Sequence, residues 1–388
     1  MKKKKKNLLG RRDVASLMYA VASKSRQYIG PIIPSCHFTT ETVYDTTTRT
    51  MYILSANVYA KRESSPPAQA SCLDDQRYIN DHFLNARNQQ LFYCAAFPPG
   101  LVSLRGVILF LHGIGEHSLR FAHVYKHLCL NGYGVIAYDM LGHGQSASEE
   151  PGLRAHGSDF EYFIDDTNTF ITTAKDIIYS KMLTNAASNP PLIIMGISFG
   201  ALVALNTILS GKHQFQGCIV ASPAIAVEYT FALRMMEIIS KPLVWIFPTA
   251  RLVPGVNFEG LTRDPEFYKD YMADPLNVTE NLTTLMAVQV GLGMKRLQSS
   301  EQIEDSNSTF CKVPLLVLQG TEDKVTSVKV VEEFMSRAAN KDKELKLFVG
   351  LYHCLWNEPE KQQVLDYATC WLNNRFDAVL NSEGASKL

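Results

Sequence analysis

Leu192-Ile193-Ile194-Met195-Gly196-Ile197-Ser198-Phe199-Gly200-Ala201-Leu202-Val203-Ala204-Leu205 is the stretch that decides the fold. Its apolar first half is typical of a buried strand, and its second half has the spacing of a helix. Ser198 therefore lies at a strand-to-helix turn of the pattern G-x-S-x-G, which presents a serine nucleophile. Gly196 and Gly200 fit because a tightly packed turn leaves little room for a Cβ atom. A simpler interpretation is a Gly/Ser turn that only joins the two elements.

The composition is that of a globular protein with a large core. The chain has 388 residues, of which 46% are hydrophobic and 20% charged, and Lys+Arg equals Asp+Glu at 38 each. This charge balance gives no general attraction to nucleic acid. The eight cysteines are scattered without metal-binding spacing, and no dinucleotide fingerprint occurs, so we expect free thiols, no metal and no cofactor. The scattered free thiols favour an intracellular, reducing compartment. No run of 18 apolar residues exists, so we expect no transmembrane helix.

Residues 1–75 differ from the rest and form a basic N-terminal extension. Lys2 to Lys6 are a block of five lysines, and Asp13 is the only acidic residue before Glu41. Such a start resembles an organellar transit peptide, a basic arm attracted to anionic lipid, or a disordered, solvated tail. Within it, Met51–Ala60 has the composition of a strand.

Strands alternate with helices over the remaining chain. After a hairpin within 83–93 with an Arg-Asn turn, we expect strands at 106–112, 134–139, 192–197, 217–223, 314–320 and 345–350. Helices are expected at 120–130, 159–178, 199–209, 328–338 and 362–374. This order is typical of an α/β fold with a mostly parallel central sheet covered by helices on both faces. The core would comprise residues 76–223 and 300–388.

Residues 224–299 interrupt the alternation and are interpreted as an inserted helical cap. Phe231–Lys241 has a narrow polar stripe on an otherwise apolar helix, and Leu243–Phe247 extends the apolar surface. One interpretation is a helix packed on the core beneath it. The other is a lid that also contacts a membrane or an acyl chain.

Two acidic residues and one histidine follow later strands in the order that a serine hydrolase requires. Asp323 and the neighbouring Glu322 come after the strand at 314–320, and His353 comes after the strand at 345–350. Because the carboxyl ends of parallel strands meet at one edge of a sheet, these residues can converge on Ser198. A serine nucleophile needs such a base and an orienting acid.

An oxyanion hole needs two backbone N–H groups. We expect one from Phe199, which follows the nucleophile, and one from Ile114 in the glycine-rich loop 112–117. His112, Glu116 and His117 in that loop are interpreted as supports that hold it by hydrogen bonds. Asp139 and His143, in the turn after the next strand, are also interpreted as structural.

Together these stretches resemble the monoacylglycerol lipase and lysophospholipase branch of the α/β-hydrolase fold. The resemblance runs from about residue 83 to 372. It rests on His112–Ser118, Asp139 followed by Gly142–Ser146, Gly196–Gly200, Thr262–Pro265, Asp274–Leu276, Gly320–Asp323, and Tyr352-His353 with Glu358. It implies a triad of Ser198, Asp323 and His353, Ile114 and Phe199 as oxyanion donors, and a mobile apolar cap. It favours Asp323 over Glu322. Ile197 departs from the family, which often has histidine before the nucleophile, and the N-terminal extension has no counterpart.

The predicted function is hydrolysis of carboxylic esters of single-chain lipids through an acyl-enzyme on Ser198. Monoacylglycerol is the expected substrate, and the cap is the expected site of peripheral membrane contact. A lysophospholipase or general carboxylesterase is the alternative. A non-catalytic lipid-binding module of the same fold is a further one, although a complete triad argues against it.

Overall fold

The computed structural model describes residues 41–45, 50–54, 77–100, 102–183, 189–226, 243–255 and 258–377. The chain divides into two compact units, residues 1–64 and residues 65–388. In the first unit, the described residues form an antiparallel pair of strands, β1 (Glu41–Asp45) and β2 (Thr50–Leu54). The predicted strand 51–60 is therefore present at 51–54, and its remainder lies outside the described residues. The lysine block at 2–6 lies outside them too.

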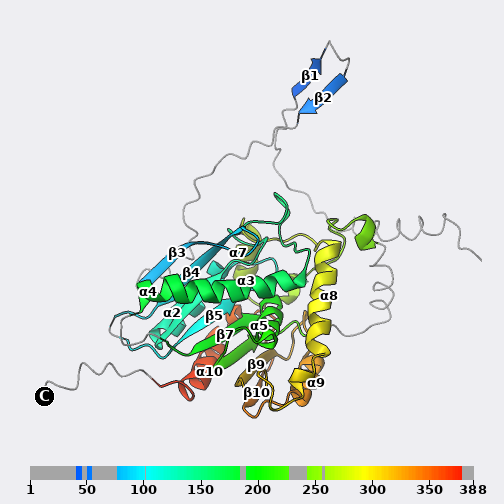
Figure 1. The fold of residues 1–388 in the computed structure, drawn as a ribbon. Helices are drawn as coiled ribbons and strands as arrows, with labels where there is room; N and C mark the ends of the chain where they lie inside the picture. Colours follow the sequence, from blue (N-terminus) through cyan, green and yellow to red (C-terminus); the bar gives the residue numbers. More distant parts are fainter. Residues whose placement is uncertain are drawn as a thin grey trace, which may run out of the picture. The chain divides into compact units, whose positions relative to one another are not determined.

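An eight-stranded sheet forms the centre of the second unit, in the order β10-β9-β8-β7-β5-β6-β4-β3 (Figure 1). The strands from β10 to β6 in this order run parallel, whereas β4 and β3 are antiparallel to their neighbours. This confirms the predicted α/β class with a mostly parallel sheet. The strands are β3 (Arg77–Leu84), β4 (Gln90–Phe97), β5 (Gly106–Leu111), β6 (Tyr133–Tyr138), β7 (Leu192–Ile197), β8 (Gly217–Ala221), β9 (Leu315–Gly320) and β10 (Lys343–Phe348).

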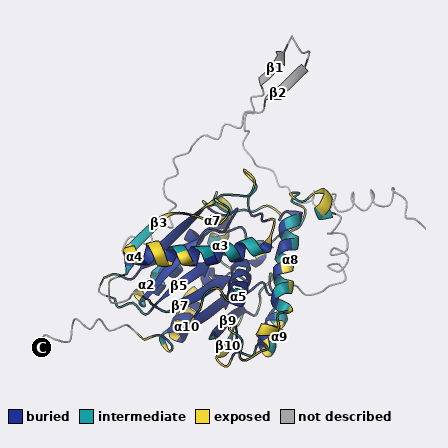
Figure 2. Ribbon diagram, in the orientation of Figure 1, coloured by how far each residue is buried: buried dark blue, intermediate teal, exposed yellow. Residues whose placement is uncertain are grey.

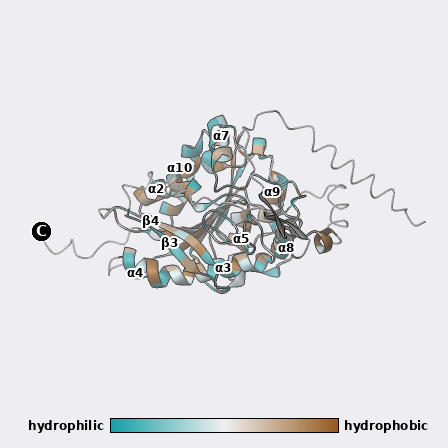
Figure 3. Cartoon of the chain, turned by 90° about the horizontal axis from the view of Figure 1, so that it is seen from above, coloured by the Kyte–Doolittle hydropathy of each residue, from teal (hydrophilic) through white to brown (hydrophobic). Residues whose placement is uncertain are grey.

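Alternate residues of the central strands enter two different hydrophobic layers. Leu109 and Ile194 belong to the layer under α3, α5, α8 and α9, whereas Ile108 and Ile193 belong to the layer under α2 and α10. Figure 3 shows α2 and α10 on one side of the strands and α3 on the other. Because both faces are covered, every residue of β5, β6, β7, β8 and β9 is buried, which explains their continuous apolar runs (Figure 2).

Four of the described helices, α3, α7, α8 and α9, begin at a short polar side chain that caps them. Asp159, Asp264, Thr283 and Ser327 each accept a hydrogen bond from a backbone N–H in the first turn of the following helix. The predicted helix 159–178 begins as expected but continues further, through a π-helical turn (Ala174–Ile178) into α4. The helices are α2 (Ala122–Leu130), α3 (Phe160–Thr173), α4 (Tyr179–Met182), α5 (Phe199–Ser210), α7 (Pro265–Ala273), α8 (Thr284–Gln298), α9 (Val328–Arg337) and α10 (Lys361–Asn373).

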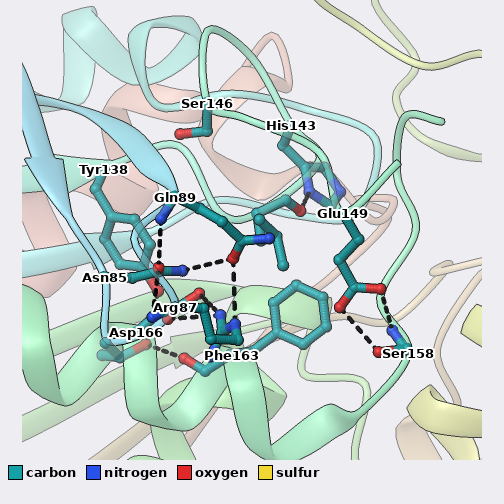
Figure 4. A network of polar contacts seen from close by, with 12 residues as sticks. Asn85, Arg87, Gln89, Tyr138, His143, Ser146, Glu149, Ser158, Phe163 and Asp166 are labelled. Atoms are coloured by element: carbon teal, nitrogen blue, oxygen red, sulfur yellow. Dashed lines mark hydrogen bonds and ion pairs between the residues drawn. The ribbon is translucent and has the colours of Figure 1, made fainter. Parts of the chain in front are cut away.

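The predicted hairpin is present as β3 and β4, and a polar cluster fastens its turn to α3 (Figure 4). The Nη2 atom of Arg87 donates to both carboxylate oxygens of Asp166 at 2.8 and 2.7 Å. Gln89 accepts from both Asn85 and Arg87. Asn88 has a φ of 58°, a turn conformation that asparagine tolerates better than most residues. Burial raises the pKa of Asp166 to about 6, although the guanidinium of Arg87 opposes the shift.

The segment between β8 and β9 contains the residues predicted to form a cap. Its described part has a short helical turn at 243–246, a 3₁₀ turn at Phe258–Gly260, then α7 and α8. The α8 helix is packed on α5 and α3. The predicted amphipathic helix Phe231–Lys241, with Arg234, Glu237 and Lys241, lies outside the described residues.

Candidate active site

The predicted nucleophile lies at a strained turn between β7 and α5. Ser198 has φ 54° and ψ −117°, a backbone conformation that residues other than glycine rarely adopt. A Cβ atom on Gly196 would meet backbone atoms of Gly200 at 2.7 Å. A Cβ atom on Gly200 would lie 2.3 Å from the carbonyl oxygens of Leu111 and His112. Both glycines are therefore required by close backbone packing, as the sequence pattern predicts.

The acid beside the histidine is Asp323 and not Glu322. Nδ1 of His353 lies 2.9 Å from Oδ2 of Asp323, and both side chains are buried. Glu322 instead is exposed and forms an ion pair with Lys324. The Asp323–His353 contact is the arrangement in which a carboxylate orients a catalytic imidazole.

Asp323 is held by several donors. Its Oδ1 accepts from the backbone N–H groups of Val325 and Thr326, and its Oδ2 accepts from the Thr326 hydroxyl and the Gln319 amide. Burial alone would raise the pKa of Asp323, but His353 and these hydrogen bonds outweigh it and lower the pKa to about 2. The carboxylate is therefore ionised throughout the physiological range.

Ser198 and His353 line one pocket at the carboxyl edge of the parallel strands. The other lining residues are Gly113, Ile114, Glu116, Ile197, Leu261, Tyr271 and Cys354. Ile114 therefore lies where an oxyanion donor is expected. The ring of Phe199 is instead buried in the layer on the α3 side and makes an edge contact with Phe163, with ring centroids 5.1 Å apart. Only the backbone N–H of Phe199 could serve the site.

The loop after β5 is held by its own polar side chains, as predicted. The Nδ1–H of His112 donates to the carbonyl of Gly113 at 2.8 Å, and its Nε2 accepts from the N–H of Met140 at 3.0 Å. Burial lowers the pKa of His112 to about 3, so it stays neutral in this role. Glu116, which is 6% exposed, accepts from the N–H of Gly113 at 3.2 Å. Burial raises the pKa of the Glu116 carboxyl, although Arg120 and His353 oppose this shift.

The turn after β6 is also structural, as predicted. The Oδ1 of Asp139 accepts from the backbone N–H and the hydroxyl of Ser118, and its Oδ2 accepts from the N–H of Gln145. His143 donates through Nδ1 to the carbonyl of Leu141 at 2.9 Å. Both side chains are buried and serve the two loops that border the pocket.

Ion pairs attach the α7 region to the core around the pocket. Arg120, buried beside the rings of Phe267 and Tyr271, donates to Asp270 and Asp274 at 3.0 Å each. His117 lies 2.9 Å from Asp274 through Nε2.

A second attachment lies nearby, where Arg263 donates to Glu358 through both its backbone N–H and its Nε atom. These contacts give a structural role to the stretches at 262–265 and 274–276. Sequence reasoning did not identify Arg120, Leu261, Tyr271 or Cys354 as part of the site, because nothing in their local pattern marks them.

The described part of the chain contains no group of three or more His, Cys, Asp or Glu residues that could hold a metal ion. Its six cysteines, of which Cys370 alone is exposed, are free thiols. The arrangement of an imidazole oriented by a carboxylate in the pocket that a serine lines is suited to nucleophilic attack by that serine.

Comparison with known proteins identifies the family to which the chain belongs. The family model described as serine aminopeptidase S33 (Hydrolase_4) matches residues 103–360. A monoacylglycerol lipase from Mycolicibacterium smegmatis is 30% identical over 275 residues, 69% of this chain and 88% of that protein. An uncharacterized abhydrolase domain-containing protein from Dictyostelium discoideum is 29% identical over 285 residues, 72% of this chain, but the chain spans only 28% of that protein's length.

Among solved structures, a soluble variant of monoglyceride lipase from Saccharomyces cerevisiae in complex with a substrate analog aligns with a TM-score of 0.66. The alignment covers 79% of this chain and 97% of the yeast chain at 23% identity. Together with the family match and the observed sheet, this similarity confirms the predicted α/β-hydrolase fold.

Proposed function

The chain belongs to the serine aminopeptidase S33 family, in its monoacylglycerol lipase branch, and from this premise we propose that Ser198, Asp323 and His353 form its catalytic triad. The chain is a serine hydrolase of carboxylic esters, and the proposed substrate is a single-chain lipid ester, most of all monoacylglycerol. The observation that carries the proposal is that His353, which lines the same pocket as Ser198, forms a buried contact with Asp323.

The proposed reaction proceeds through an acyl-enzyme. Ser198 Oγ attacks the ester carbonyl while Nε2 of His353 takes its proton, and Asp323 stabilises the resulting imidazolium. The N–H groups of Ile114 and Phe199 would stabilise the negative oxygen of the tetrahedral intermediate. The C–O bond to the alcohol then breaks, and His353 returns the proton to the glycerol leaving group. A water molecule, deprotonated by His353, then attacks the acyl-enzyme. His353 returns this proton to Ser198 Oγ as the bond to the acyl group breaks, and the fatty acid is released.

The charge of the pocket supports a neutral head group. Among the described residues that line the pocket there is no lysine or arginine, and the acidic side chain there is Glu116. The phosphate of a lysophospholipid would lie near this carboxyl group, where the described residues offer no free cation, because the nearby Arg120 is already bonded to Asp270 and Asp274. A glycerol head group carries no charge and can form hydrogen bonds with either protonation state of Glu116.

The proposal includes a lipid-facing cap formed by part of residues 224–299. Trp245, Ile246, Phe247 and Leu252 are 87%, 56%, 50% and 51% exposed. Together they give the segment an apolar surface of the kind that inserts into a lipid interface. No helix within the described residues is long and apolar enough to cross a membrane. An intracellular location is the accompanying proposal, supported by the buried free thiols.

A substrate panel with a nucleophile variant tests the proposal. Purified protein should hydrolyse monoacylglycerol faster than lysophosphatidylcholine, and Ser198→Ala should lose roughly 10⁴- to 10⁶-fold in kcat because the triad acts as a unit. A fluorophosphonate probe should label the wild-type chain and leave Ser198→Ala unlabelled. Full esterase activity in Ser198→Ala would refute the triad. A preference for lysophosphatidylcholine would refute the proposed neutral head group of the substrate but would leave the triad standing.

A further inference from the structure

The backbone turns sharply at the end of β8, at a residue that neither the sequence motifs nor the proposed reaction uses. Ser222 is fully buried and has a φ of 43°, a conformation that favours glycine. Its N–H still extends the sheet by donating to the carbonyl of Leu318 at 2.8 Å. A side chain kept at such a backbone position points to a role for the side chain itself.

The hydroxyl of Ser222 donates to the carbonyl oxygen of His353 at 2.7 Å. This hydrogen bond joins residues 131 positions apart and is buried. The same carbonyl also accepts from the N–H of Leu355 at 3.0 Å. Ser222 therefore connects the main chain of the histidine loop directly to the central sheet.

The residues on either side of Ser222 hold the nucleophile. The carbonyl of Ala221 accepts from the N–H of Ser198 at 3.0 Å, and the N–H of Ala224 donates to the carbonyl of Ser198 at 3.1 Å. The four-residue segment 221–224 thus bonds the backbone of Ser198 at both its N–H and C=O groups. One short turn contacts the two residues between which the proton must move.

We propose that Ser222 is a positioning residue that fixes the distance between His353 and Ser198 by bonding the His353 carbonyl to the turn that holds Ser198. The inference rests on the proposed function, in which His353 is the base. The His353 ring is oriented by Asp323 at Nδ1, but this contact fixes the ring's direction and not the position of the histidine main chain relative to Ser198. Other contacts hold the loop at Gly350 and Cys354, on either side of the histidine.

Three substitutions distinguish a positioning role of Ser222 from a merely stabilising one. Two of them use the positive φ of Ser222. Ser222→Ala removes the hydroxyl and keeps the Cβ atom in a strained conformation. Ser222→Gly removes the hydroxyl but relieves the strain, so it should melt at a higher temperature than Ser222→Ala. Thr207→Val is the matched control, because the Thr207 hydroxyl is also buried and bonds a carbonyl, that of Val203, within α5.

Steady-state kinetics with 4-nitrophenyl butyrate and thermal unfolding are measured on all three variants. If Ser222 positions the histidine, both Ser222 variants should lose about 10- to 100-fold in kcat with KM within about twofold, since a small misplacement of a catalytic group has this effect. Thr207→Val should keep its kcat despite a lower melting temperature. The two Ser222 variants should be equally slow although they differ in melting temperature.

A spectroscopic measurement follows the histidine directly. The imidazole N–H that His353 donates to Asp323 should give a downfield proton resonance, assigned by its absence in His353→Gln. We expect this resonance to broaden in both Ser222 variants and to stay sharp in Thr207→Val. The proposal is overturned if Ser222→Ala keeps the wild-type kcat, or if kcat follows melting temperature across the three variants. Ser198→Ala separates the two hypotheses: activity that survives there refutes the triad, whereas full activity in Ser222→Ala with an inactive Ser198→Ala refutes only the positioning role.

Discussion

The floor and the roof of the pocket are built from different kinds of interaction. The floor consists of the carboxyl ends of β5, β7, β8 and β9 with the loops that carry Ser198, Asp323 and His353. It is held by buried backbone hydrogen bonds and by glycines without space for a Cβ atom. We call the proposed cap, residues 243–255 and 258–298, the roof. It contributes Leu261 and Tyr271 to the pocket lining, ion pairs of Arg120 and Arg263 attach its α7 region, and it exposes large apolar side chains. Changes in the floor should therefore affect folding and chemistry, and changes in the roof should affect substrate binding and lipid contact.

Gly200→Ala should have the largest effect. The new methyl group would lie 2.3 Å from two backbone carbonyl oxygens, and backbone atoms cannot move aside as a flexible side chain can. We expect a loss of about 3 kcal/mol or more in unfolding free energy, or no soluble protein. Chemical denaturation measures it.

Gly291→Ala is the matched control for this prediction. Gly291 lies within α8 in the roof, and a Cβ atom there would meet no atom within 4 Å. Alanine should raise the unfolding free energy by about 0.5–1 kcal/mol, since glycine is unfavourable inside a helix. Equal effects of the two substitutions would contradict the stated difference between floor and roof.

Asp323→Asn should be the next largest, and its effect should be on chemistry. The amide can accept hydrogen bonds from Thr326 but cannot stabilise an imidazolium as the carboxylate does. We expect kcat to fall by about 10³- to 10⁴-fold with little change in KM. Glu322→Gln is the control and should keep its kcat, because Glu322 is exposed and bonded to Lys324. A similar loss in both variants would show that the acid was misassigned.

Asp274→Asn should affect the attachment of the roof. Removing the charge weakens the contacts with the buried Arg120 and with His117, and we expect a loss of about 2 kcal/mol in unfolding free energy. Because a loosened roof no longer shapes the pocket, KM for a lipid ester should rise more than kcat falls. If kcat instead fell more than KM rose, Asp274 would act on the catalytic residues of the floor and not on substrate binding.

The same substitution should change the response to acid. Burial would raise the pKa of Asp274, but His117 and the other hydrogen-bond donors lower it well below its usual range. A depressed carboxyl pKa contributes stability that is present above about pH 4 and is lost as the pH falls further. The melting temperature of the wild-type chain should therefore drop more steeply below about pH 4 than that of Asp274→Asn. Parallel curves for the two proteins would contradict this account.

Most of the floor could be predicted from the sequence, because its strands and its turn at Ser198 are encoded by neighbouring residues. The buried strands are continuous apolar runs, and Ser198 lies between the two glycines that its turn needs. The convergence of Asp323 and His353 on Ser198 follows from the rule that the carboxyl ends of parallel strands meet at one edge of the sheet. The choice between Glu322 and Asp323 was different. Both follow the same strand, and only the family resemblance favoured the residue that the fold directs inward.

The roof carried much less signal in the sequence. Arg120 and Asp274 are 154 residues apart, and neither lies in a pattern that predicts a partner. One contact of the floor was missed for a similar reason: the hydroxyl of Ser222 bonds a carbonyl that any residue at position 353 would provide, so residue types alone could not reveal it. Interactions between side chains and a distant main chain depend on the assembled fold, and for that reason they were missed.

The exposed apolar residues of the roof should matter least for the isolated enzyme and most at a lipid surface. Trp245→Glu with Ile246→Glu should leave the hydrolysis of soluble 4-nitrophenyl butyrate within about twofold of wild type, because both side chains are exposed. Binding to liposomes in a flotation assay should fall at least about tenfold, since burying one such side chain contributes about 1.5–3 kcal/mol. Leu84→Glu with Leu130→Glu is the control, because both leucines are 56% exposed and lie on β3 and α2, outside the roof. If both double variants lose liposome binding equally, then exposed apolar side chains anywhere on the surface support binding. The assignment of lipid contact to the roof would then be wrong.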